Sequence, residues 1–344
     1  MSLGYDKALY LLPFDHRHSY VDGLFGFKPP LSASQGDEVI DSKQLIFEGF
    51  RQALAEGVPT EAAAILVDEE FGAHILRDAR RRGFVTTLSV EQSGIDEFKF
   101  EYGDDFASHI EAFDPSFAKV LVRYNPEGDK ALNLRQFRGL KQLCDYCQRS
   151  RRRFMFELLV PATTDQLARM DGDKDAFDRL MRPELMLQAI QALQAAGVEP
   201  DVWKIEGLDS RDDCEHIVRM ARRDGRYGVG CIVLGRGADE ARVRSWLATA
   251  ASVEGFIGFA VGRTTFWDAV AGYRARTLTR NEAASQIARR LRDWVDVFEQ
   301  GHWPNSEAAR LPFTAVGQNN FGTAGVLPGQ RPLGFTVSDE MNMK

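Results

Sequence analysis

Residues 118–160 contain the pattern that decides the fold: two apolar runs, AKVLVRY (118–124) and FMFELLV (154–160), separated by a stretch of helical period at 133–151. Both runs are short and rich in β-branched and aromatic residues, which favours strands over helices. Strands that are joined through a helix run parallel to each other. This part of the chain therefore predicts one strand–helix–strand unit of a parallel sheet.

The same unit recurs in both directions along the chain. Six further runs have strand character, at 8–14, 63–67, 84–90, 201–206, 230–234 and 255–261. Helical patterns follow the strands at 43–56, 71–82, 105–112, 183–196, 211–223 and 239–252, and a long closing helix is expected over 265–299. Eight strands, each followed by a helix, match the α/β (β/α)₈ TIM barrel better than an open doubly wound sheet. The chain also lacks the G-x-G-x-x-G motif that a dinucleotide-binding open sheet carries after its first strand.

The composition of the chain limits the classes of partner that are expected. The 344 residues carry a formal charge of -7, so no global field attracts nucleic acid or an anionic membrane. No apolar run has the length of a spanning helix, and the first residues lack the order of a secretory signal, so a cytoplasmic protein is expected. Beyond Trp303 the helical period gives way to Gly, Pro, Asn and Thr. We therefore expect a barrel at 1–302 and an extended C-terminal tail at 303–344.

The cysteines contribute no chemistry. Cys144 and Cys147 form the one C-x-x-C pair, but neither a second ligand pair nor a thioredoxin-like context accompanies it. Ordinary reduced thiols in a helix are the interpretation, with redox or zinc chemistry as the alternative.

Charged residues interrupt three strands that should be apolar. Alternation along 118–124 places Lys119 and Arg123 on one face, and the same argument turns Glu157 inward from 154–160. Lys204 and Glu206 share a face of 201–206. Because charges cannot face the helix layer cheaply, we expect all of these groups to face the lumen and to converge there.

The strand ends add two acids, Asp15 and Asp68, at the rim where barrels keep their chemistry. A lysine beside a second ammonium loses proton affinity, so either of Lys119 and Lys204 could lower the pKa of the other. A neutral amine can attack a ketone to form a Schiff base, with Glu157 shuttling protons. Asp15 would hydrogen-bond or deprotonate a substrate hydroxyl. The alternative is a mutually satisfied buried ion network without catalysis.

Two glycine turns follow the seventh and eighth strands. They are Gly235-Arg236-Gly237 and Gly262-Arg263. Glycine lets backbone N–H groups approach a phosphate, a helix N-terminus favours negative charge, and arginine adds a bidentate donor. These turns predict a phosphate site, although tight turns alone would also explain the glycines.

At these residues the sequence resembles the class I aldolases of the tagatose-1,6-bisphosphate aldolase-like group. It is most similar to the aldolase-like domain that is fused to 5-dehydro-2-deoxygluconokinase in bacterial inositol catabolism. The segments that carry the resemblance are LLPFDHRHSY, ILVDEEFGAHILRDA, DEFKFEYGDDFASHIEAF, KVLVRYNPEGD, FMFELLVPAT, GVEPDVWKIEGLD, GCIVLGRG and GFIGFAVGRTTFWD.

The resemblance implies roles for several residues. Lys204 would be the Schiff-base lysine, Glu157 the proton shuttle, Lys119 the second active-site lysine, Asp15 the substrate-orienting acid and Arg263 a phosphate ligand. It also implies cleavage of 2-deoxy-5-keto-gluconate 6-phosphate to dihydroxyacetone phosphate and malonate semialdehyde, without a cofactor.

The chain departs from the aldolase pattern at two turns. Asp15-His16-Arg17 stands where tagatose-type aldolases have an Asp-Gln-Arg turn, and Arg236 replaces a small residue. Both changes suit a substrate with an additional carboxylate, which His16 could contact. His16 could instead serve as an acid–base group or bond the backbone of a loop, and Arg17 is expected beside Asp15 at a substrate hydroxyl.

Other possibilities stay open. A sugar kinase partner and a homo-oligomer are expected, and the long segment after the first strand is expected to form a lid or a subunit contact. A catalytically weak sugar-phosphate-binding or assembly module is the alternative function. A divalent cation on Asp15, His16, Asp68 and Glu69 is disfavoured, because no ligand pair has a recognised metal spacing and two lysines oppose a cation.

Overall fold

The computed structural model describes residues 2–301, which form a closed parallel barrel. Its eight strands follow one another around the barrel in chain order, and β1 pairs with β8 to close it. The strands are β1 (Leu9–Pro13), β2 (Ala63–Val67), β3 (Val85–Ser89), β4 (Phe117–Arg123), β5 (Arg153–Leu159), β6 (Val202–Glu206), β7 (Gly230–Leu234) and β8 (Phe256–Ala260). The predicted (β/α)₈ TIM barrel is confirmed. The tail predicted at 303–344 lies outside the described residues.

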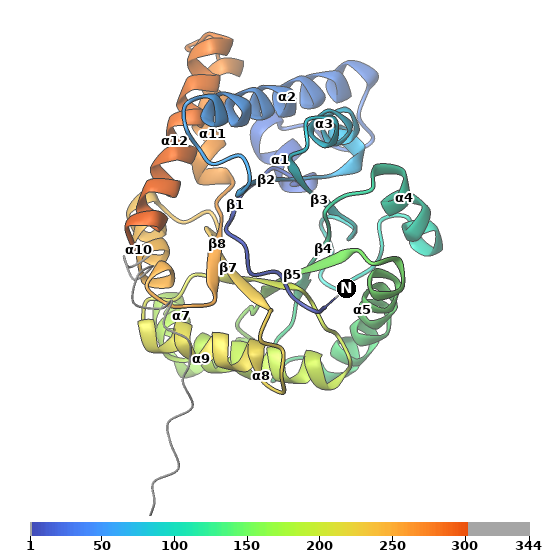
Figure 1. Ribbon diagram of the computed structural model, residues 1–344, viewed down its shortest axis with the longest axis vertical. Coiled ribbons are helices and arrows are strands. Elements are labelled where there is room, and N and C mark those ends of the chain that lie inside the picture. Colours follow the sequence, from blue (N-terminus) through green and yellow to red (C-terminus); the bar gives the residue numbers. More distant parts are fainter. Residues whose placement is uncertain (1, 302–344) are drawn as a thin grey trace, which may run out of the picture. The chain divides into compact units, whose positions relative to one another are not determined.

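Helices surround the ring of strands, as Figure 1 shows. The longer helices are α2 (Ala33–Ala55), α3 (Glu69–Arg81), α4 (Phe106–Phe113), α5 (Lys130–Ser150), α8 (Arg182–Ala195), α9 (Arg211–Arg222), α10 (Glu240–Ala251), α11 (Arg263–Arg274) and α12 (Arg280–Gly301). Shorter segments are α1 (His18–Tyr20), a π-helical turn (Val21–Phe25), a 3₁₀ turn (Gly103–Asp105), α6 (Thr164–Arg169) and α7 (Lys174–Leu180). No helix within residues 2–301 has the length and apolar character for crossing a membrane.

The expected closing helix over 265–299 is two helices. α11 ends at Arg274, Arg276 adopts a left-handed φ of 58°, and α12 begins at Arg280. Thr279 and Glu282 bond reciprocally across the new start, with the Thr279 N–H donating to the Glu282 carboxylate at 2.7 Å. This capping box starts a second helix because it satisfies N–H groups that have no partner within the helix.

The segment after β1, expected as a long loop, also contains more helix than predicted. α2 begins at Ala33, ten residues before the expected start, because Ser32 and Gln35 form another capping box. Ahead of it, the rings of Tyr20 and Trp267 pack edge to face with their centroids 6.2 Å apart, and the Arg274 guanidinium lies 4.0 Å from the Phe25 ring centroid. The segment is therefore packed against α11.

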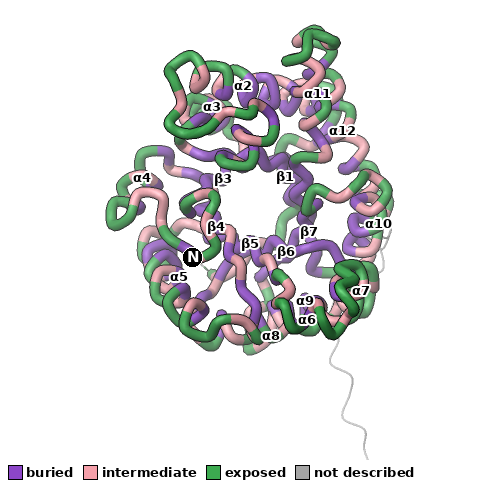
Figure 2. The backbone as a smooth tube through the Cα atoms, turned by 180° about the vertical axis from the view of Figure 1, so that it is seen from behind, coloured by how far each residue is buried: buried purple, intermediate pink, exposed green. Residues whose placement is uncertain are grey.

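Two apolar layers enclose the strands. The outer layer lies between strands and helices and includes Val120, Phe156 and Trp203, which alternate with the inward-facing residues. The inner layer fills the lower barrel lumen with Leu9, Leu11, Ala64, Leu66, Phe117, Met155, Val202, Ile232, Ile257 and Ala260. Most strand residues are buried, as the tube in Figure 2 shows. Most of the inner layer comes from the first halves of the strands, so the barrel is filled below and polar at its C-terminal end.

Cys144 and Cys147 lie buried in α5, as predicted, and neither forms a disulfide. Burial raises the pKa of the Cys144 thiol to about 11, so it is a thiol rather than a reactive thiolate at neutral pH.

Candidate active site

A cavity of about 430 Å³ lies where the strands end. Its lining contains most of the residues that the sequence predicted for the site: Asp15, His16, Arg17, Lys119, Glu157, Lys204, Gly235, Arg236, Gly237, Gly262 and Arg263. Asp68 and Glu206, which were also expected there, do not line it. The roles of the lining residues stay predictions, but their common location is a property of the fold. Parallel strands all end at one edge, so residues far apart in sequence meet there.

Glu157 joins the two lysines. In the register of β5 and β6 it is directly opposite Lys204, and its Oε2 lies 2.8 Å from the Lys204 Nζ. The same oxygen lies 2.9 Å from the Nζ of Lys119 on β4. All three side chains are buried. Alternation along neighbouring strands brings them together, as the sequence predicted.

Lys119 has two more carboxylate partners. Its Nζ donates to Asp15 at 2.7 Å and to Glu91 at 2.7 Å. Burial would lower the pKa of Lys119, but Asp15, Glu157 and Glu91 raise it well above the ordinary value. The expectation that a neighbouring ammonium lowers the pKa of Lys119 is therefore wrong, because three anions surround it.

The pKa values of the neighbouring acids respond to the same ammonium. Burial would raise the pKa of Asp15, but Lys119 holds it below its usual range. Burial would likewise raise the pKa of Glu157, which Lys119 and Lys204 lower instead. Both groups are therefore carboxylates at neutral pH.

Glu91 is the part of this cluster that sequence reasoning missed. It lies just beyond β3, where Thr87, Ser89 and Glu91 continue one alternating face. That alternation was the available signal, but the predicted strand ended at Val90. Its Oε1 accepts from Lys119, whereas its Oε2 is buried without a hydrogen-bond partner. Burial raises the pKa of Glu91 despite the ammonium, so Glu91 holds a proton more tightly than its neighbouring acids.

His16 follows Asp15 at the rim. Lys43 holds its backbone by donating to the His16 carbonyl oxygen at 3.1 Å, and the ring meets Phe266 edge-on at 6.3 Å. Its Nδ1 has no hydrogen-bond partner. Burial lowers the pKa of His16 to about 4, against the opposing effect of Asp15, so the imidazole is neutral at pH 7.

Arg17 is buried and connects two segments of the barrel rim. Its Nη1 lies 2.7 Å from the Glu101 carboxylate, and its Nη2 donates to the backbone carbonyl of Glu91. These contacts fasten the end of β1 to the segment after β3. The guanidinium lines the cavity, but its charge is already paired.

The glycine turns bring two backbone segments close together. The Nη2 of Arg263 donates to the Arg236 carbonyl at 2.9 Å, across Gly237 with its left-handed φ of 74°. A Cβ on Gly237 would lie 2.4 Å from that guanidinium nitrogen, and one on Gly262 would lie 2.4 Å from the Pro13 carbonyl oxygen. The turn at Gly262 therefore has no room for a larger residue, and Gly237 is favoured by its left-handed φ. Arg263 is the first residue of α11, so its backbone N–H lies at the positive end of a helix.

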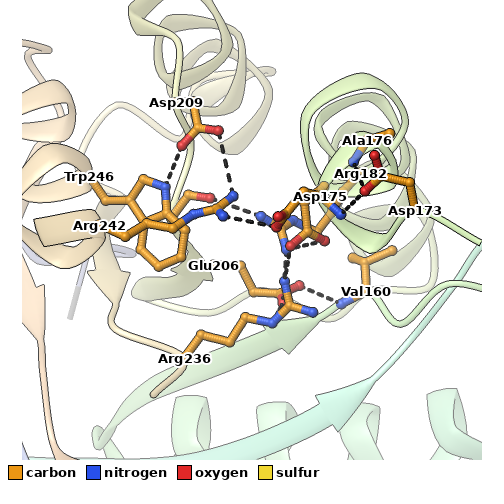
Figure 3. A network of polar contacts seen from close by, with 12 residues as sticks. Val160, Asp173, Asp175, Ala176, Arg182, Glu206, Asp209, Arg236, Arg242 and Trp246 are labelled. Carbon is orange, nitrogen blue, oxygen red and sulfur yellow. Dashed lines mark hydrogen bonds and ion pairs between the residues drawn. The ribbon is translucent and has the colours of Figure 1, made fainter. Parts of the chain in front are cut away.

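The side chain of Arg236 is bound to a separate network, drawn in Figure 3. Its Nη1 lies 2.7 Å from Asp178 and its Nε lies 3.1 Å from Glu206. Glu206 also accepts from the Val160 N–H at 2.8 Å, and the buried Arg182 lies 2.7 Å from Asp178. The expectation that Glu206 converges with the lumen lysines is wrong, since these two arginines bind it and it does not line the cavity.

Asp68 stabilises the fold and does not line the cavity. Its Oδ2 accepts from the Phe71 N–H at 2.8 Å as the N-cap of α3, and its Oδ1 pairs with the buried Lys43. Glu69 lies 2.8 Å from His109 on α4. Across residues 2–301, no three His, Cys, Asp or Glu side chains are arranged to hold a metal ion.

A family model matches nearly the whole described part of the chain. The model of a family described as "Uncharacterized protein conserved in bacteria (DUF2090)" matches residues 4–302. The chain belongs to this family. No curated protein matches it.

Solved structures similar to this DUF2090 member share its fold. Fructose-bisphosphate aldolase from Plasmodium falciparum, solved with TRAP and a small-molecule inhibitor, is 12% identical with a TM-score of 0.55, over 88% of this chain and 92% of that chain. Cgl0159 from Corynebacterium glutamicum is 16% identical with a TM-score of 0.51, over 85% and 88% of the two chains. The aldolase-type barrel that the resemblance implies is therefore confirmed at the level of the fold.

Proposed function

We propose that this DUF2090 protein is a class I aldolase, an aldehyde-lyase in which Lys204 forms a Schiff base with the ketone of a phosphorylated substrate. The observation that carries the proposal is the shared oxygen of Glu157. Lys119 has two further carboxylates and stays charged, whereas Lys204 has Glu157 alone within ion-pair distance among residues 2–301. Lys204 is therefore the amine with a single proton acceptor, at the wall of a cavity that can hold a substrate.

Imine formation needs two proton movements. Glu157 is within hydrogen-bond reach to accept a proton from the Lys204 ammonium, which leaves a neutral amine to attack the ketone carbon. The carbinolamine hydroxyl then takes a proton from Glu157 and departs as water, and the C=N bond forms. Lys119 stabilises the Glu157 carboxylate before the first transfer and after the second.

Carbon–carbon cleavage follows from the charge of the imine. The protonated imine withdraws the bonding electrons, the substrate hydroxyl loses its proton, and an aldehyde departs. Asp15 is the proposed base for this proton, because Lys119 keeps the Asp15 carboxylate ionised. The enamine left on Lys204 regains a proton at carbon, and water releases the ketone product.

The phosphate group would bind at the two glycine turns. Arg263 supplies a guanidinium, and the N-terminus of α11 supplies backbone N–H groups in the field of the helix. Among residues 2–301, no carboxylate lies within 4.0 Å of the Arg263 guanidinium nitrogens, so its charge is available to an anion.

The resemblance of the sequence supplies the specific substrate. We propose 2-deoxy-5-keto-gluconate 6-phosphate, which would be cleaved to dihydroxyacetone phosphate and malonate semialdehyde in inositol catabolism. Its ketone is adjacent to the phosphate-bearing carbon, which agrees with an imine at Lys204 and a phosphate at Arg263. A sugar kinase that phosphorylates the keto acid is the partner that this reaction requires.

Borohydride trapping tests the proposal. Incubation of the full chain with dihydroxyacetone phosphate and sodium borohydride should add covalent mass to the peptide that contains Lys204. Lys204→Met should abolish the adduct, whereas Lys141→Met, which removes a surface lysine paired with Asp145, should leave it unchanged. Reversible binding without an adduct would favour the sugar-phosphate-binding module instead. Normal cleavage by Lys204→Met would exclude the imine mechanism.

A further inference from the structure

Most cations that line the cavity are already neutralised. Arg17 pairs with Glu101, Lys204 with Glu157, and Lys119 with three carboxylates. Arg236 lies between Asp178 and Glu206. To bind any of these residues, a second anionic group on the substrate would have to displace a carboxylate that is already paired. Breaking that ion pair costs more free energy than the new contact provides.

Arg123 differs from them. It is the last residue of β4, on the same face as Lys119 and Leu121, and it lines the cavity at the rim. Its side chain is 40% exposed, and its nearest carboxylate is 3.7 Å away on Asp96, a side chain that is 89% exposed. An exposed pair at that distance contributes little, so a ligand can replace it.

The backbone nevertheless orients the guanidinium. The Nη1 of Arg123 donates to the Ile95 carbonyl at 3.1 Å, which fixes the side chain against the segment between β3 and α4. The neighbouring acid Glu97 accepts from the Nε and Nη2 of Arg135, both at 2.9 Å, and does not compete. Arg123 therefore keeps donors for an incoming anion.

The barrel places Arg123 opposite the phosphate site. In a ring of eight strands, β4 lies across from β8, and β6 is two strands from each. Neighbouring strands are about 4.8 Å apart, so Lys204 lies roughly 10 Å along the wall from both β4 and β8. Arg123 and Arg263 thus mark two ends of the cavity, with the reactive amine between them.

We propose that Arg123 binds a carboxylate at the end of the substrate opposite the phosphate, so that the substrates are terminally phosphorylated sugar acids rather than phosphorylated neutral sugars. This inference rests on the proposed function for the site and names its specificity residue. It moves the recognition of the carboxylate from the turns after β1 and β7 to the end of β4.

Binding of two unreactive probes tests this assignment. 6-Phosphogluconate has a phosphate and a carboxylate at its two ends, and glucitol 6-phosphate has a hydroxymethyl group in place of the carboxylate. Neither has a ketone, so the measurement is independent of imine chemistry. By calorimetry at low salt, the wild-type chain should bind 6-phosphogluconate about tenfold more tightly or better. Arg123→Gln should remove this preference and leave the affinity for glucitol 6-phosphate unchanged.

Arg138→Gln is the control, because it removes an exposed arginine of α5 that does not line the cavity. It should keep the preference, and both variants should keep the wild-type melting temperature. Equal binding of the probes by the wild type, no binding of either probe, or a preference that survives in Arg123→Gln would each overturn the assignment. Failure of borohydride trapping with a normal probe preference would instead exclude the imine and leave the carboxylate site standing.

Discussion

Lys119 and Lys204 contact the same oxygen atom, since the Oε2 of Glu157 lies 2.9 Å from one Nζ and 2.8 Å from the other. The two lysines are nevertheless unequal. Asp15 and Glu91 complete a shell of three acids around Lys119, and no such shell surrounds Lys204 within residues 2–301. Three acids hold the first lysine in place, whereas the second has one ion-pair partner among the described residues.

Lys119→Met should strongly destabilise the protein. The substitution leaves three buried acids without their common cation, and breaking a buried ion pair from one side costs about 3–5 kcal/mol. Urea unfolding at pH 7 measures the loss. The surface substitution Lys141→Met should change the free energy of unfolding by about 0.5 kcal/mol or less. A Lys119→Met protein as stable as the wild type would show that the acids do not depend on this ammonium.

Glu157→Gln should slow Schiff-base formation. The amide cannot accept a proton from Lys204, and loss of a general acid–base group costs about 10²–10⁴ in rate. The time course of borohydride trapping with dihydroxyacetone phosphate gives this rate directly. Glu48→Gln, which alters a surface pair with Arg280, should trap at the wild-type rate. Wild-type trapping by Glu157→Gln would remove Glu157 from the mechanism.

His16 should make the folded state sensitive to mild acid. Its pKa is about 4 in the folded protein and about 6.5 when unfolded, so its contribution is complete above about pH 6.5 and is lost as the pH falls toward 4. Between about pH 7 and pH 5 this group alone should lower the free energy of unfolding by about 2 kcal/mol.

The variant His16→Asn isolates this contribution. The difference in unfolding free energy between wild type and His16→Asn should change by that amount across the two pH values, as chemical denaturation would measure. A difference that does not vary with pH would mean that the imidazole is not held neutral by its surroundings.

Arg182→Met tests the network of Figure 3. Arg182 is buried against Glu206 and Asp178, and burial already raises the pKa of Glu206 despite that arginine. We expect a loss of about 3–5 kcal/mol in unfolding free energy, because a buried acid loses its partner. Arg236→Gln should cost less, since Arg236 is partly exposed. Equal losses in the two variants would contradict this ranking.

The barrel and the convergence of Lys119, Glu157 and Lys204 could be predicted from the sequence, because both depend on local periodicity. Alternation within β4, β5 and β6 is enough to place Lys119, Glu157 and Lys204 on inward faces, and parallel strand order makes them neighbours. The strand boundaries agree to within one residue, since apolar runs end where the turns begin.

Contacts between distant segments were harder to predict. Glu206 shares its face with Lys204, yet Arg182 from α8 and Arg236 from the turn after β7 bind it, and no periodicity reveals that arrangement. The capping boxes at Ser32 and Thr279 were readable as short motifs, but the apolar pattern outweighed them in placing the helices. Glu91 was missed because it lies one residue past the predicted strand.

Because side chains fill the lower lumen, the cavity opens only at the C-terminal rim of the barrel within residues 2–301. Aliphatic and aromatic side chains seal the barrel beneath Lys119 and Lys204, so whatever enters from the rim must also leave by the rim. Under the proposed cleavage, both products would have to leave through the rim. The product nearer the rim would leave first and the product bound to Lys204 second, so the closed lower lumen would impose an order of release.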